Sequence, residues 1–137
     1  MELFDTILEK LNEMGAECGR TTDENGADII GVSIKGDNYP PLFFQLFLNS
    51  EANAQIICFD VCRFSDDKRM DALKVVNKLN ADYRWVKFWA NDDGKIVALV
   101  DVFCHSGLLP EYIMSDFGLL LKTLDEAYPV LNKELAE

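Results

Sequence analysis

The sequence predicts an α+β protein with three helices and an antiparallel sheet of about five or six strands, in the order helix, three strands, helix, two strands, helix. Three segments repeat apolar residues at spacings of three and four, as amphipathic helices do. Shorter runs that alternate apolar and polar residues lie between them, and short turns join these runs. The 137 residues match the size of one domain, so we expect a single domain over residues 1–137.

The three helices are predicted from their apolar stripes and their end signals. The first covers residues 2–14. The second begins at Ser65 or Asp66, because either side chain can cap a helix N-terminus. The third is C-terminal, and Pro129 is expected to end or kink it near Tyr128. The stripes consist of Leu3, Phe4, Ile7, Leu8, Leu11 and Met14, of Met70, Leu73, Val76 and Leu79, and of Ile113, Phe117, Leu120, Leu124, Ala127 and Leu131.

The strands are predicted where apolar runs are bounded by turn formers. Residues 20–26 are polar and rich in turn formers, and are therefore expected to form a loop or a hairpin tip. The Asp93-Gly94 pair is typical of a two-stranded hairpin, so the last two strands should pair with each other. The predicted strands are, in chain order, 27–35, 42–48, 54–62, 84–90 and 95–104.

The charge balance excludes several classes of partner. Twenty-four acidic residues against 13 basic ones give a net charge of −11. Such a chain is repelled by phosphate backbones and by anionic membrane surfaces, so we expect neither nucleic acid nor membrane as a partner. Residues 1–5 do not resemble the start of a signal peptide, and no apolar run approaches the ~20 residues of a membrane helix. We therefore expect a cytoplasmic protein.

Few residues are available for metal or covalent chemistry. The four cysteines are expected to be reduced, because Cys58 and Cys62 would lie roughly 13 Å apart in a straight strand, too far for one metal or one disulfide. The single histidine is His105, so a catalytic triad would have to use it, and the adjacent Ser106 cannot be assumed to reach its imidazole. The sequence contains no phosphate-binding loop, zinc-binding motif or dinucleotide motif. We expect no cofactor, no metal and no catalytic residue.

Two acidic residues leave an alternative open. Asp60 and Asp101 are each embedded in an apolar strand, and a buried carboxylate is a candidate for acid–base chemistry. A small-ligand pocket or an enzyme site near these carboxylates and the tryptophans is the alternative function. The simpler explanation is that each carboxylate lies on an exposed sheet face or meets a nearby Lys or Arg.

Aromatic residues give the stronger indication of a binding surface. Strand alternation places Phe43 and Phe47 opposite the apolar row that contains Phe44, and it places Trp85 and Trp89 opposite Val86 and Phe88. The same rule puts Ile57, Phe59 and Val61 on one face of the middle strand. If the helices cover only one face of the sheet, the second apolar face needs another cover. That cover is either a helix or a partner, and we expect a dimer or protein-binding face that contains Phe43, Phe47, Trp85 and Trp89.

The segment 76–88, followed by the hairpin at Gly94 and the strand 95–102, resembles the YbjN family of bacterial sensory-transduction regulators. The resemblance extends over about residues 60–131 and rests on Asn77, Asn80, Tyr83, Lys87, Phe88, Tyr128 and Pro129. It implies a fold like that of type III secretion chaperones, which are small, often dimeric α+β proteins that bind protein segments. It brings no catalytic residues with it.

We therefore expect a non-enzymatic, dimeric protein-binding module, acting as a regulator or a chaperone-like adaptor. Its expected partners are a second copy of the chain and another protein or peptide segment.

Overall fold

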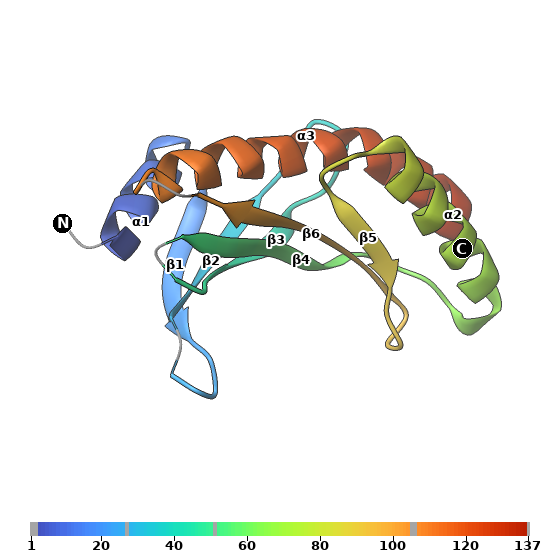
Figure 1. Cartoon of the computed structure of the whole chain (residues 1–137). Helices are drawn as coiled ribbons and strands as arrows, with labels where there is room; N and C mark the ends of the chain where they lie inside the picture. Colours follow the sequence, from blue (N-terminus) through green and yellow to red (C-terminus); the bar gives the residue numbers. More distant parts are fainter. Residues whose placement is uncertain (1–2, 27, 51, 105–106, 137) are drawn as a thin grey trace.

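The computed structural model describes residues 3–26, 28–50, 52–104 and 107–136 (Figure 1). Helix α1 (Leu3–Glu13) is followed by strands β1 (Glu17–Thr22), β2 (Asp28–Ile34), β3 (Leu42–Leu48) and β4 (Asn53–Arg63). A short 3-10 helix, η1 (Asp66–Lys68), leads into α2 (Arg69–Asp82). The chain ends with β5 (Lys87–Ala90), β6 (Lys95–Phe103) and the long helix α3 (Leu109–Leu135).

All six strands form one sheet in the order β1-β2-β3-β4-β6-β5. Every neighbouring pair is antiparallel. The chain leaves β4, passes through α2 to the far edge, and returns through β6 into the gap between β4 and β5. The predicted α+β class with an antiparallel sheet and three helices is confirmed.

The element order differs from the prediction at one place, because four strands precede α2. Residues 20–26 were expected to form a loop or a hairpin tip, but residues 17–22 form β1, which pairs with β2 from Glu17–Ser33 to Thr22–Asp28. Only the turn at residues 23–26 lies outside the strands. The expectation failed because β1 is an edge strand with five of its six residues exposed, so it lacks the apolar alternation that marks a half-buried strand.

All three helices pack on the same face of the sheet (Figure 1). Helix α3 runs along the length of the sheet and contributes Ile113, Phe117 and Leu124 to the core. Of the two outcomes expected at Pro129, an end of the helix is excluded, because α3 passes through the proline and continues to Leu135. Leu131 and Leu135 are both buried in the core, and their burial stabilises the turns beyond the proline.

A bulge in β4 corrects a second prediction. Cys58 pairs with Ala98 but Cys62 pairs with Ile96, so β4 contains two more residues than β6 between these pairs. Strict alternation placed Val61 with Ile57 and Phe59, whereas the bulge turns Val61 into the core under the helices. The side chains N-terminal to the bulge keep the predicted alternation.

The sheet edge at β5 is closed by one side chain of α2. The Nδ2 group of Asn80 donates to the carbonyl of Phe88 (2.9 Å), and the backbone N–H of Phe88 donates to Oδ1 of Asn80 (2.8 Å). These bonds satisfy backbone groups that face away from β6. The side chain of Asn80 therefore fixes the position of β5, and with it the side chains on both faces of this strand.

Candidate protein-binding face of the sheet

The sheet face opposite the helices has its own apolar cluster, which we call the open face. Ile57, Val97 and Leu99 are buried there, and Phe47 and Trp89 pack against them. No helix residue of the described part of the chain belongs to this cluster. The register explains the grouping, since Ile57 pairs with Leu99 and Val97 pairs with Trp89 across adjacent strands. The open face is therefore shielded only by its own side chains.

Aromatic rings provide this shielding on β3 and β4. The rings of Phe47 and Phe59 meet edge to face with centroids 6.4 Å apart. Phe43 lies over Gly31 of the neighbouring strand, where a Cβ would come within 2.7 Å of the ring. Despite these contacts, Phe43 is 56% exposed and Phe59 is 42% exposed. An apolar surface of this kind on a sheet is typical of a protein contact.

The structure places the four predicted face residues as follows. Phe43, Phe47 and Trp89 lie on the open face, as alternation indicated. Val86 and Phe88 point to the opposite side and are buried under the helices. Trp85 differs, because β5 begins at Lys87 and Trp85 lies in the bend that precedes it. It is the most exposed large hydrophobic residue described, at 67%.

Two further aromatic residues contribute to this face. Phe59 follows Ile57 on the same side of β4, and alternation had assigned it to this face without singling it out. Phe103 is 60% exposed and lies at the end of β6, two positions beyond Asp101. Alternation from Val97 through Leu99 and Asp101 was the signal that could have found it.

The carboxylates of the alternative function are not brought together. Asp60 accepts two hydrogen bonds from Arg63, from Nε at 3.0 Å and Nη2 at 2.9 Å. Asp101 accepts one from Nε2 of Gln55 at 2.9 Å. Gln55 pairs with Asp101 across the strands, and Asp60 lies five residues further along β4, inside the bulge, so the two carboxylates are roughly 10 Å or more apart. Asp60 meets an arginine and Asp101 is exposed, which are the two situations named by the simpler explanation.

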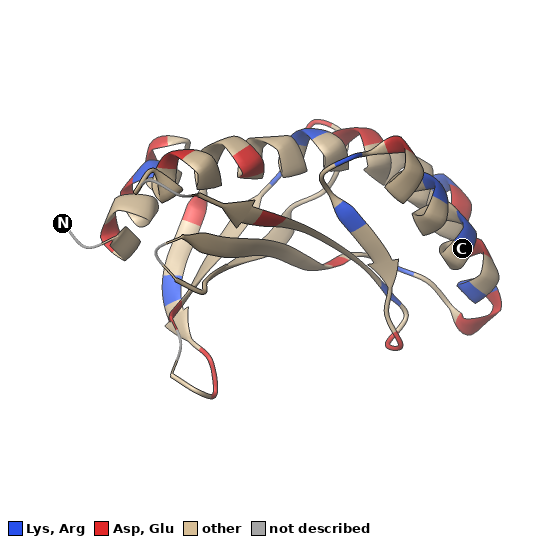
Figure 2. Ribbon diagram, in the orientation of Figure 1, with Lys and Arg blue, Asp and Glu red and all other residues tan. Residues whose placement is uncertain are grey.

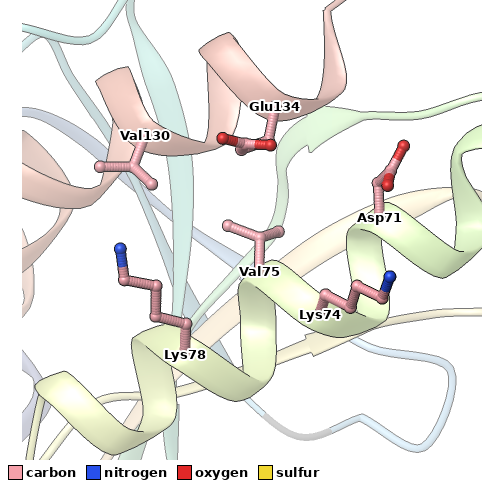
Figure 3. A pocket seen from close by; sticks show the side chains of 6 residues that line it. All are labelled: Asp71, Lys74, Val75, Lys78, Val130 and Glu134. Carbon is pink, nitrogen blue, oxygen red and sulfur yellow. The ribbon is translucent and has the colours of Figure 1, made fainter.

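The described cavities also lie elsewhere. One of about 230 Å³ lies between α2 and α3, where Val75 of α2 points toward Glu134 of α3, and Lys78 of α2 points toward Val130 (Figure 3). Another of about 350 Å³ lies near the ends of β1 and β2 and is lined by residues 14–16 and 33–35. Neither these nor the two other described cavities are lined by Asp60, Asp101, Trp85 or Trp89.

The cysteines are placed as small core and sheet residues. All four are free, and Cys58 and Cys104 are buried. Burial raises the pKa of the Cys58 thiol to about 12, and burial raises that of Cys62 to about 12 as well. Thiols with such pKa values are poor nucleophiles and poor metal ligands at neutral pH. Within the described ranges, no three His, Cys, Asp or Glu side chains gather as a metal site would require.

Two sequence-based expectations could be compared with the structure only in part. His105 and Ser106 lie outside the described residues. Among the residues that are described, no helix combines the length and the apolarity needed to cross a membrane.

The fold and the open face define an α+β protein with a one-sided helix layer and an aromatic sheet surface. The model of the YbjN family, described as "putative bacterial sensory transduction regulator", matches residues 4–133. The chain belongs to the YbjN family. No curated protein matches it significantly. Among solved structures, it is similar to the crystal structure of YbjN from E. coli, "a putative transcription regulator", with a TM-score of 0.68 and 12% identity over 96% of this chain and 93% of that one.

Proposed function

We propose that this chain is a non-enzymatic regulator that acts as a homodimer and binds a further protein or peptide segment, as an adaptor or chaperone-like module. It acts in the cytoplasm as a single domain. The observation that supports this function most directly is the open face, where aromatic side chains cover an apolar cluster that no described helix reaches. The family description supports the regulatory role.

The first occupant of the open face in this proposal is a second copy of the chain. An aromatic side chain presents about 200 Å², so the exposed fractions of Phe43, Phe59 and Phe103 leave on the order of 300 Å² of aromatic surface. A stable interface removes about 800 Å² from each partner. These three rings alone would provide more than a third of that area, and the neighbouring apolar and polar side chains can provide the rest.

Replacing Trp89 and its neighbour Phe88 with alanine tests the role of the face. Phe88 is 1% exposed in the core under the helices, so Phe88→Ala should cost about 3–5 kcal/mol of folding free energy. Trp89 packs against the open-face cluster and remains partly exposed, so Trp89→Ala should cost less stability and should weaken dimerisation. Urea unfolding measures the first effect, and size analysis over a concentration series measures the second.

The two variants serve as controls for each other, because the residues are adjacent and point to opposite faces of β5. If Trp89→Ala destabilises the fold as much as Phe88→Ala and leaves the folded molecules dimeric, the open face is not the contact between copies.

A further inference from the structure

The two outer edges of the open face differ in charge. On the β1–β2 hairpin, Glu17 shares the open side with Gly19 and Thr21, and the turn contains Asp23 and Glu24. The one basic residue of this hairpin is Arg20, and it lies on the other side, 4.0 Å over the ring of Phe4 in α1. There it pairs with Asp28 at 2.7 Å. We call the three carboxylates Glu17, Asp23 and Glu24 the acidic edge.

At the opposite edge of the sheet, the bend before β5 and the start of this strand carry only basic charges. Lys87 of β5 is exposed on the open side, with its Nζ 5.6 Å from the centre of the Trp89 ring. Arg84 is exposed in the bend before β5. Residues 83–90 contain no acidic residue, although the whole chain has a net charge of −11. Asp92 and Asp93 lie beyond the strand, in the β5–β6 turn, next to Lys95. We call Arg84 and Lys87 the basic edge.

Both outer hairpins bend toward the open side, away from the helix layer (Figure 1). The turn of the β1–β2 hairpin projects from this side, whereas the basic residue of β5 lies near the start of that strand, before the projecting turn (Figure 2). Figure 2 shows acidic residues on the β1–β2 hairpin and its turn, and a basic residue on β5. The central strands between these edges provide the aromatic rings. A matching partner is apolar in its centre, basic opposite the acidic edge and acidic opposite the basic edge.

A second copy of this chain has these properties. We propose that two copies stack open face to open face about a two-fold axis along the strands, so that the acidic edge of each lies over the basic edge of the other. A two-fold interface forms each contact twice, so one complementary pair of edges stabilises both ends. An axis along the strands also keeps the two sheets aligned, which is a preferred packing of sheets. This arrangement rests on the dimer proposed above and specifies its orientation.

Charge reversal on exposed side chains tests the orientation. One variant reverses the acidic edge with Glu17→Lys and Glu24→Lys. The other reverses the basic edge with Arg84→Glu and Lys87→Glu. In either variant alone, both symmetric contacts become like-charged, so the dissociation constant of its homodimer should rise about tenfold or more at low salt. In a mixture, each contact joins opposite charges, so a heterodimer should form about as tightly as the wild-type dimer.

Native mass spectrometry, with a mass tag on one variant, measures homodimers and heterodimers together. A matched control reverses Lys74 and Lys78 on α2, in the helix layer, and should leave dimerisation unchanged (Figure 3). A heterodimer no tighter than the two homodimers, or homodimers as tight as the wild type, overturns the orientation while the dimer stands. A wild-type chain that stays monomeric contradicts the dimer itself.

Discussion

Asn80 has a structural role that its exposed position on α2 does not suggest. Its amide makes both hydrogen bonds to the backbone of Phe88, at 2.9 and 2.8 Å. An edge strand otherwise leaves such groups to water or to another chain. This asparagine is one of the residues on which the resemblance to the YbjN family rests, and the structure gives it a physical function in holding β5.

Asn80→Ala should lower the free energy of unfolding by about 1–3 kcal/mol, because two backbone groups of β5 lose their partner. Asn77 is the matched control, since it is also an exposed asparagine of α2 and no described hydrogen bond involves its side chain. Asn77→Ala should change stability by less than about 0.5 kcal/mol. Urea denaturation of the two variants compares them, and equal effects would contradict the role given to Asn80.

The thiols of Cys58 and Cys62 should react slowly with a thiol reagent at neutral pH. Burial raises the pKa values of Cys58 and Cys62 to about 12, so almost no thiolate is present in the folded protein. After denaturation without reductant, four thiols per chain should be titrated, one for each cysteine in the sequence. Fewer than four would reveal a disulfide, and stoichiometric zinc in elemental analysis would reveal a metal site that we do not expect.

Residue-level predictions from alternation succeeded where the backbone is regular. Phe88 and Trp89 were assigned to opposite faces from the sequence, and the structure has them so. Val61 was assigned to the wrong face, because a bulge has no marker in this sequence that alternation can detect. Trp85 was placed in a strand that begins two residues later.

At the scale of elements, apolar patterning located the elements that bury side chains. Apolar patterning did not predict β1, because an exposed edge strand has no row of buried apolar side chains. It also left open whether α3 ends or kinks at Pro129, and the helix continues to Leu135 and buries Leu131 and Leu135. In both cases the neighbouring elements decide the local structure. The sequence pattern of β1 does not show that β1 can pair with the edge of β2. The pattern of α3 likewise does not show that its last turns pack against the core.

The β5–β6 hairpin depends on the glycine of its turn. Gly94 has a φ of +79°, and a Cβ there would lie 2.8 Å from the carbonyl oxygen of Phe64. Gly94→Ala should therefore cost about 1–2 kcal/mol of stability. Gly118→Ala is the comparison, because Gly118 lies in α3 with nothing within 4 Å of a Cβ, and it should stabilise the protein by about 0.5–1 kcal/mol. Thermal unfolding measures both changes, and a neutral Gly94→Ala would contradict the strain argument.

At the scale of the whole molecule, the sequence indicated two apolar sheet faces but left their covering open. The structure shows that the three helices share one face (Figure 1). Helix amphipathicity alone could not decide this, since it tells that a helix packs on a sheet and not on which side. The charges of the two sheet edges could not be predicted from the sequence either. They depend on the strand order, which places the β1–β2 hairpin and β5 at opposite edges of the sheet.

Light scattering on the unmodified chain tests most directly whether the open face is an interface between copies. At micromolar concentration and physiological salt, we expect a particle of twice the 15.5 kDa chain mass, which dissociates on dilution. The Trp89→Ala chain should dissociate at a higher concentration than the wild type while remaining folded. A wild-type particle of 15.5 kDa at every concentration measured would contradict the account.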